Sequence, residues 1–510
     1  MDAALAASPV LLVLVLMIGL GWSAARAGAV TGVFTLFLAV GAFDFGGADD
    51  PFGAPTGVLG VLAEAAFITA TVVAIIGPAL GIHHLQEQTG ATDRLRSALA
   101  RLHPDPRVGA LLIAWFFCLF MEGAAGFGTP VALAAPFLVA AGFQPVTAVA
   151  AALVGHAAGV SFGAVGTPVV AQLAIVDVSG LDIARATATY HLFLGWILLA
   201  VVLVLIGRSS PDRAAPWRWG ILAGILFFLP FGLIAFLVGP ELPTLGGALV
   251  GVVVFALVAI WHRRSILPEL VDTDLDHSGS EGSDEVRVLS AAAPYLVLVG
   301  LVLVTRLVTP LRDLLERVEI EWRTDAGFTG AVLPLVHPAL LLTAAFGAGA
   351  VAQRASLTVV REAFWMATRR LGPVVVALVA MVTIARAMSH AGMTVELADA
   401  AATTGAAWPL LAPAVGALGT FVTGSATASN VLFTELQEST AEAADLPVTP
   451  LLGAQGFGAA VGNIICPHNI VAAVATVGLT GQEGPVLRRT LPTAAVYVAL
   501  GGAVALVLTR

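Results

Sequence analysis

Apolar runs of membrane-spanning length recur along the whole chain and are separated by short polar stretches. A helix needs about 17–25 predominantly apolar residues to cross the hydrocarbon core of a bilayer. The pattern therefore predicts an all-α polytopic membrane protein, with about twelve spans, rather than an anchored soluble protein. Simple spans are expected near residues 5–22, 30–45, 62–82, 186–207, 217–238, 243–261, 291–309, 330–350, 371–389 and 490–508.

Arginine in the short loops predicts the orientation of these spans, because basic loops stay on the inner side of the membrane. Residues 83–107 and 354–370 each carry several arginines, whereas the loop after the second span carries Asp44 and Asp50. We therefore place both arginine-rich loops inside. Residues 310–325 mix both charges and suggest a short surface helix.

An acidic stretch, residues 263–290, lacks an apolar run and is expected to be a cytoplasmic linker. It divides an N-terminal transmembrane half, residues 1–262, from a C-terminal half, residues 291–510. The simplest interpretation of this stretch is a solvated connector.

Two regions of the N-terminal half do not fit simple spans. Residues 108–142 are too long for one helix and too short for two helices with an outside loop, and they are interrupted at Glu122–Gly128. Glycine and proline break helical pairing, so irregular backbone at membrane depth indicates a segment that faces a cavity. We expect a re-entrant hairpin that enters from the inside, followed by one discontinuous helix over 147–177 with its break at 163–168.

The same order recurs about 300 residues later. Residues 406–440 break at 424–430 and predict a second hairpin, and residues 449–478 break at 462–467 and predict a second discontinuous helix. By the loop count, the second hairpin enters from the outside. An inverted repeat with interrupted helices in matching places is typical of the midplane site of a secondary transporter. The alternative is a chance match among spans that share 54 glycines.

Composition narrows the function classes. The chain is 58% hydrophobic and only 11% charged, against roughly 25% charged residues in soluble domains. The two cysteines lie in apolar surroundings, so neither a disulfide framework nor a zinc cluster is expected. No Walker motif, nucleophile elbow or His-Glu-x-x-His motif occurs, so the sequence predicts no ATP-driven transport, no enzyme, no cofactor, no metal site and no nucleic-acid partner. A membrane enzyme or assembly factor without transport is the alternative of a different class.

Broken helices expose unpaired N–H groups at half-helix N-termini, where the positive dipole end favours an anion. The breaks also carry hydroxyl and amide groups that suit a small carboxylate. Each hydroxyl taken alone has the alternative of bonding its own helix backbone. The candidate substrate-binding residues are Glu122, Gly126, Gly128, Thr129, Ser161, Thr167, Ser425, Thr427, Ser429, Asn430, Asn463, His468 and Asn469.

The candidates for carrying a coupling proton are Glu122, His156 and His468. Apolar surroundings favour the neutral form of a carboxyl group, and histidine titrates near neutral pH. The alternative for Glu122 is a structural carboxylate that accepts backbone N–H bonds at the hairpin tip. Glu64, His191 and Arg386 also lie in or near apolar spans, where Arg386 would compensate a carboxylate or extend to the interface.

Several of these motifs resemble the lactate permease family. The stretches that carry the resemblance, between about Val108 and Tyr497, are Glu122-Gly-Ala-Ala-Gly-Phe-Gly-Thr-Pro130, Phe162-Gly-Ala-Val-Gly-Thr-Pro168, Phe421-Val-Thr-Gly-Ser-Ala-Thr-Ala-Ser-Asn-Val-Leu-Phe433 with Leu436-Gln437, Gly462 to Pro467, Ile470-Val-Ala-Ala-Val and Thr476-Val-Gly-Leu-Thr-Gly481. The resemblance implies uptake of L-lactate, and often of D-lactate and glycolate, with protons across the cell membrane. It also implies paired re-entrant hairpins and elevator-like movement, as in the wider ion-transporter superfamily.

The chain departs from the family pattern in four places. Ala426 stands where the resemblance implies an aspartate, and Asn463 stands where it implies a lysine. Cys466-Pro-His468 replaces Ser-Pro-Gln, and His156-Ala-Ala-Gly159 replaces Asn-Thr-Ala-Pro. Removing both partners of a buried ion pair can be nearly neutral, whereas removing one leaves a charge unpaired. The joint loss of an acid and a base therefore suggests that the two pair in relatives.

Together the sequence predicts a secondary transporter that imports a small hydroxymonocarboxylate, such as lactate or glycolate. Protons are the expected coupling ion, with sodium as the alternative. A sodium-coupled transporter of dicarboxylates or other anions is the rival function, although buried arginine for a second carboxylate is scarce. The spans outside the hairpins are expected to supply a homodimer contact within the lipid bilayer.

Overall fold

The computed structural model describes residues 2–20, 22–47, 50–100, 103, 105–126, 128–209, 216–266, 281–479 and 482–510. Within these ranges, eleven helices are long and apolar enough to cross a membrane, or twelve if one bent helix pair counts as a span. This confirms the predicted polytopic all-α membrane protein. Much of the expected linker at 263–290 lies outside the described residues.

The long apolar helices follow one another along both halves of the chain. They are α3 (Ala24–Ala42), α4 (Ala54–Gln88), the continuous run of α6 (Pro106–Leu111), η2 (Leu112–Phe117) and α7 (Cys118–Ala124), α11 (Gly180–Ser209), α12 (Trp217–Leu237), α13 (Pro243–Ile266), α15 (Glu281–Leu307), α18 (Leu357–His390), α20 (Trp408–Thr423), α22 (Val448–Gly462) with α23 (Pro467–Thr476), and α24 (Glu483–Leu508).

Shorter elements complete the described part of the chain. They are α1 (Asp2–Ala6), α2 (Ser8–Leu14), η1 (Val15–Gly19), α5 (Ala91–Ala100), α8 (Thr129–Ala140), α9 (Pro145–Ala157), η3 (Val160–Phe162), α10 (Gly163–Leu173), α16 (Thr309–Leu315), α17 (Pro338–Ala352), α19 (Met393–Ala402), η5 (Gly405–Ala407) and α21 (Ala426–Ala443). Strands β1 (Ile320–Arg323) and β2 (Thr329–Val332) form one antiparallel pair, with Ile320 opposite Val332.

Three predicted segments differ from the structure. The first apolar run, 5–22, forms α1, α2 and η1 and is too short and interrupted to count as a spanning helix. The predicted span at 330–350 begins as strand β2 and becomes helical only at Pro338, whose fixed backbone angle suits the first turn of a helix. The expected surface helix at 310–325 is helical only in α16 and continues as β1.

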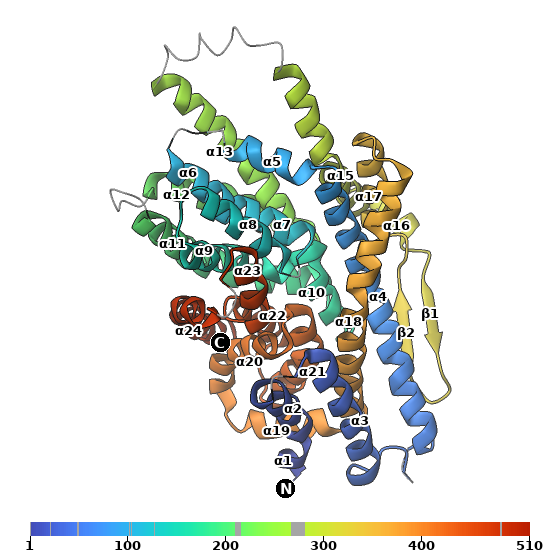
Figure 1. Cartoon of the computed structure of the whole chain (residues 1–510). Coiled ribbons are helices and arrows are strands. Elements are labelled where there is room, and N and C mark those ends of the chain that lie inside the picture. Colours follow the sequence, from blue (N-terminus) through green and yellow to red (C-terminus); the bar gives the residue numbers. More distant parts are fainter. Residues whose placement is uncertain are drawn as a thin grey trace.

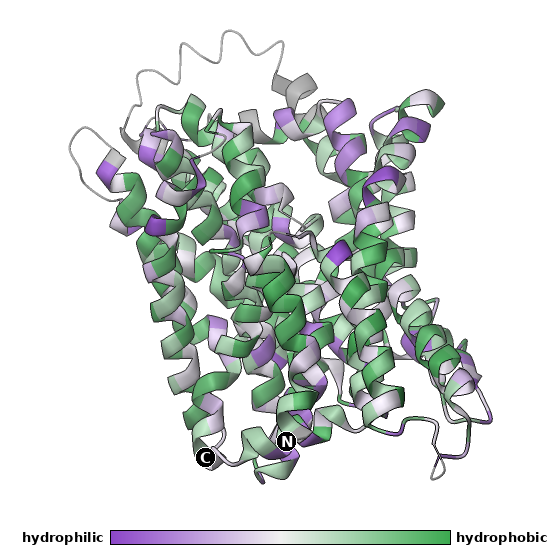
Figure 2. Cartoon of the chain, turned by 60° about the horizontal axis from the view of Figure 1, so that its bottom comes forward, coloured by the Kyte–Doolittle hydropathy of each residue, from purple (hydrophilic) through white to green (hydrophobic). Residues whose placement is uncertain are grey.

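The two longest helices, α4 and α18, pack side by side and run lengthwise through the molecule (Figure 1). They contain 35 and 34 residues, which is about 50 Å of helix at 1.5 Å per residue. Because the hydrocarbon core is only about 30 Å thick, their ends extend beyond it. Apolar residues dominate the long helices, and hydrophilic residues are most frequent toward the helix ends (Figure 2).

Beside this pair, two groups of broken helices meet. Helices α7, α8, α9 and α10 come from the first half, and α20, α21, α22 and α23 come from the second (Figure 1). Helix α10 packs on α21, and α8 packs on α23. Helices α9, α10, α21 and α22 are buried along most of their length, so the breaks that they carry lie inside the protein.

Candidate functional site

A small cavity lies where the helix breaks of the two halves meet. Its volume is about 30 Å³, which is space for about one water molecule. The lining residues are Glu122, Gly126, Gly128, Val160, Gly163, Ala164, Thr167, Pro168, Gly424, Ser425, Ala426, Thr427 and Asn463. All four breaks expected from the sequence therefore contribute to one cavity.

The first break separates α7 from α8. Gly126 and Gly128 have positive φ angles of 58° and 77°, a region that glycine adopts at little cost. A Cβ atom on Gly128 would lie 3.1 Å from the side-chain oxygen of Asn469, so this turn packs closely on the start of α23. Helix α8 consequently begins at the cavity wall, with its first N–H groups near the cavity.

The second break lies in α10 and is the most strained backbone of the site. Ala164, Val165 and Gly166 are consecutive left-handed residues, with φ angles of 43°, 56° and 77°. For the β-branched Val165 this conformation is costly and persists only where the surroundings enforce it. The surroundings are tight, because a Cβ atom on Gly166 would lie 2.5 Å from the carbonyl oxygen of Pro240. The chain also bends just before this break, because α9 and the segment Val160–Leu173 lie at 58° to each other.

The two breaks of the second half are closed by polar side chains. Gly424 is left-handed, and the Ser425 side chain caps α21 by accepting from the backbone N–H of Ala428 at 3.3 Å. Between α22 and α23, the Asn469 amide donates to the Asn463 side-chain oxygen at 2.7 Å. A Cβ atom on Gly424 would lie 3.9 Å from the sulfur of Cys466, so the two breaks touch.

Glu122 is 4% exposed and lines the cavity from the last turn of α7. A Cβ atom on Gly163 would lie 2.1 Å from the Oε1 atom of Glu122, so only glycine leaves room for the carboxyl group there. Within the described ranges, no hydrogen bond or ion pair reaches this carboxyl group. This arrangement fits a group that gains and loses a proton better than a carboxylate that caps backbone N–H groups.

Several predicted site residues lie beside the cavity rather than in its lining. Thr129 is buried at the start of α8. Ser161 bonds His191 at 2.8 Å and donates to the carbonyl of Gly456 at 3.0 Å. Ser429 donates to the carbonyl of Gly416 at 2.8 Å. These two hydroxyl groups join neighbouring elements, which differs from the stated alternative that each bonds its own helix backbone.

Asn430 joins the two halves, because its amide donates to the carbonyl of Pro168 at 2.9 Å.

The two histidines proposed as proton carriers lie apart from the cavity lining. His156 is buried and bonds the carbonyl of Ala152 in its own helix at 3.1 Å. His468 is exposed beside Gly424. Their proton-carrying roles stay predictions, and the geometry favours Glu122 among the three.

Some cavity residues were absent from the predicted set. Gly163 and Gly424 belong to the predicted break motifs, so the glycine pattern of these motifs could have identified them as lining residues. Val160 carries no such signal.

Outside the cavity, the Nε atom of Arg386 lies 2.7 Å from the Oε2 atom of Glu64, which confirms that Arg386 compensates a buried carboxylate.

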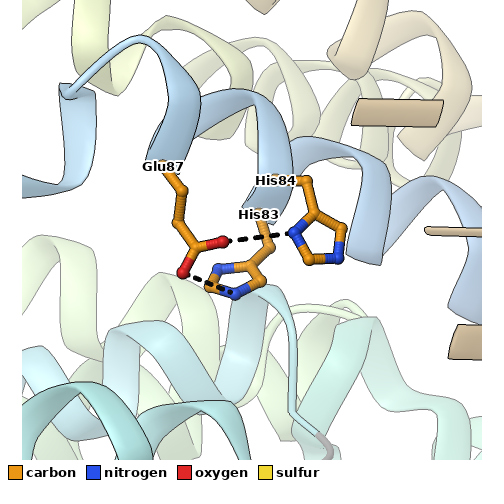
Figure 3. A group of neighbouring side chains, drawn as sticks. All are labelled: His83, His84 and Glu87. Atoms are coloured by element: carbon orange, nitrogen blue, oxygen red, sulfur yellow. Dashed lines mark hydrogen bonds and ion pairs between the residues drawn. The ribbon is translucent and has the colours of Figure 1, made fainter. Parts of the chain in front are cut away.

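One group of described residues has the composition of a metal site. His83, His84 and Glu87 lie on the last turns of α4, and their ligand atoms are all within 4.8 Å of one another (Figure 3). Glu87 pairs with His83 at 3.5 Å and with His84 at 3.1 Å. The other ring nitrogen of each histidine is buried without a hydrogen-bond partner among the described residues. Metal-bound histidines normally have such a partner, so the site lacks the supporting contacts of a built metal centre.

Comparisons with known proteins agree with one another. A family model described as L-lactate permease matches residues 2–329 and 322–510. The L-lactate permease of Escherichia coli (strain K12) is 28% identical over 84% of this chain and 83% of its own. Glycolate permease GlcA of the same organism is 27% identical over 94% of this chain and 90% of its own. The solved structure of MtrF from Neisseria gonorrhoeae, described as illuminating a class of antimetabolite efflux pumps, covers 96% of this chain and 95% of its own with a TM-score of 0.51 and 15% identity. This last likeness concerns the fold.

Proposed function

This chain belongs to the L-lactate permease family, and from that premise we propose that it imports a hydroxymonocarboxylate such as lactate or glycolate by proton symport. It is a multi-pass transporter of the cell membrane, not an enzyme, and its substrate is a small carboxylate. The observation that supports the finer proposal most strongly is the cavity, in which Glu122 faces helix breaks of both halves.

The helix ends make this cavity suitable for one carboxylate. Helices α8 and α21 both begin at its wall, and unpaired N–H groups at helix N-termini attract anions. Ser425, Thr427 and Asn463 add polar groups in the same lining. Among the described residues, the lining contains no arginine and therefore no cationic partner for a second carboxylate, which favours a monocarboxylate over a dicarboxylate.

Glu122 supplies the coupling in this proposal. An ionised Glu122 and a bound carboxylate in one buried cavity repel each other. Protonation of Glu122 therefore strengthens binding of the anion, and binding of the anion strengthens protonation by the same factor. A proton and a carboxylate consequently bind and leave together.

The small volume of the cavity requires movement. A hydroxymonocarboxylate is several times larger than the single water molecule that fits into about 30 Å³. We propose that residues 108–142 and 406–440 act as re-entrant hairpins in an inverted repeat of halves 1–262 and 291–510. Their tips separate to admit the substrate, and the broken helices then move against α4 and α18 in an elevator-like manner. The spans outside the hairpins supply a homodimer contact.

Uptake of labelled lactate into proteoliposomes tests the function directly. The expected result is accumulation under an inward proton gradient, competition by unlabelled glycolate, and weak competition by succinate. Accumulation that follows a sodium gradient instead would replace proton coupling with the sodium alternative. Absence of carboxylate uptake under either gradient would contradict the proposal.

A further inference from the structure

A second set of charged side chains lies where α4 and α18 meet α21, away from the cavity. Glu64 on α4 is 3% exposed. Its Oε2 atom lies 2.7 Å from the Nε atom of Arg386 and 2.8 Å from the Nε2 atom of His390, both on α18. Its Oε1 atom accepts from the backbone N–H of Thr329 in β2 at 3.1 Å. Glu64 is therefore fully paired at this position.

Glu435 on α21 shares the same arginine but is poorly paired. Its Oε2 atom lies 3.7 Å from the Nη1 atom of Arg386, which is too long for a hydrogen bond. This oxygen is buried without a hydrogen-bond partner among the described residues. Two carboxylates thus depend on one guanidinium group that is always charged. One added proton, on Glu435 or His390, would balance the charges of the set, and an unbalanced buried charge is costly.

Acidic residues continue from Glu435 along one face of α21. Glu438 and Glu442 follow at spacings of three and seven residues, which places all three on the same side of the helix. Burial decreases along this line, because Glu435 and Glu438 are half-buried and Glu442 is exposed. The electrostatic neighbours of Glu438 are Glu442, Glu435 and the exposed Asp177. The line connects the surface to the buried set through groups that can each hold a proton.

The remaining elements around α21 add little charge to this path. Ser389 of α18 is a hydrogen-bonding neighbour of Glu435. Helix α19 carries Glu396 and Asp399, which are exposed, and it turns Thr394 and Leu397 toward Glu435. Helices α10, α20 and α22 carry no charged residue. The charged groups that face Glu435 are thus Arg386, His390, Glu64 and Glu438.

We propose that Glu64, Arg386, His390 and Glu435 form a second proton-binding site, additional to Glu122, that is loaded along the acidic face of α21. Helix α21 begins in the cavity at Ser425–Thr427, and Glu435 lies eight residues beyond Thr427, about 12 Å along the helix. Protonation changes the ionic contact between α21 and α18, so one helix responds both to the proton and to the carboxylate. The transport role of this site rests on the proposed proton symport.

The test compares two activities of the full-length protein in proteoliposomes with labelled lactate. Lactate–lactate exchange needs no net proton movement, whereas accumulation under an inward proton gradient does. For Glu435→Gln we expect accumulation to fall at least ~10-fold while exchange stays measurable. The matched control is Glu396→Gln on the exposed face of α19, which keeps both activities. Wild-type accumulation by Glu435→Gln would overturn the proposal.

The number of protons that the purified protein takes up in detergent tests the second proton-binding site independently of transport. Between about pH 8 and pH 6 an ordinary glutamate stays ionised, whereas this set should take up one proton. Glu435→Gln is expected to take up about one proton fewer per chain than the wild type, and Glu396→Gln the same number as the wild type. Uptake of equal numbers of protons by all three proteins would overturn the proposed proton-binding site. A wild-type protein that moves no carboxylate would contradict the symport proposal alone, because the proton count does not depend on lactate.

Discussion

Glu122 is the residue at which a proton and the substrate meet in the proposed cycle. Glu122→Gln keeps the shape of the side chain and removes its ionisation. Uptake by the wild type should rise as the outside pH falls, whereas uptake by the variant should be slow and independent of pH. We expect the initial uptake rate at acidic pH to fall at least about tenfold, which corresponds to about 1.4 kcal/mol of activation free energy.

The measurement is the initial rate of lactate uptake at a series of outside pH values. Glu319→Gln, at an exposed glutamate before β1, is the control and should match the wild type. A variant at position 122 that keeps the pH profile of the wild type would remove this residue from the coupling.

Ala426 and Asn463 stand where the family resemblance implies an acid and a base, and both line the cavity. Ala426→Asp alone places an unpaired carboxylate beside Glu122 and should cost roughly 3–5 kcal/mol, enough to abolish expression or transport. Adding Asn463→Lys should restore both. Expression and lactate uptake are measured together, with Ala400→Asp on the exposed face of α19 as control. A harmless single change would show that the two positions do not behave as a pair.

At the scale of elements, glycine allows α7 to touch the start of α13. A Cβ atom on Gly123 would lie 2.4 Å from the backbone nitrogen of Leu245. Gly123→Ala should therefore lower the free energy of unfolding by roughly 1–3 kcal/mol. Gly109→Ala, in the same helical run with nothing within 4 Å of the added atom, should be neutral or stabilising by up to about 1 kcal/mol. Thermal unfolding in detergent measures both, and equal transition temperatures would refute the close approach.

Signals local in sequence predicted most elements, and pairings distant in sequence escaped prediction. Glycine marks all four helix breaks and proline three of them, because their backbone preferences act within a few residues. Hydropathy does not report whether an apolar run forms one continuous helix, so it predicts simple spans at 5–22 and 330–350, where the structure has interrupted or shorter helices. The sequence predicts that Arg386 either compensates a carboxylate or extends to the interface, but its partner Glu64 lies 322 residues away and no local pattern identifies it. The Val160 part of the cavity wall was missed for the same reason.

At the scale of the whole molecule, the small volume of the cavity predicts a change in accessibility during transport. Cys466 is buried between α22 and α23, beside Gly424, and Cys118 is buried within α7. If the tips separate during transport, Cys466 in a Cys118→Ser background should react with a small maleimide at least ~10-fold faster with lactate and a proton gradient than without them. Cys118 in a Cys466→Ser background should show no change. Equal rates for Cys466 in both conditions would contradict opening at this break.

The hydrogen bond from Asn430 to the carbonyl of Pro168 also has a consequence for biosynthesis. Its two residues are 262 positions apart, so the strained break in α10 is made long before the side chain that closes it. At roughly 5–20 residues per second, the ribosome needs about 13–50 s to produce that partner. The first half therefore waits in the membrane with an open polar break, and this is the interval in which membrane quality-control proteases would compete with folding.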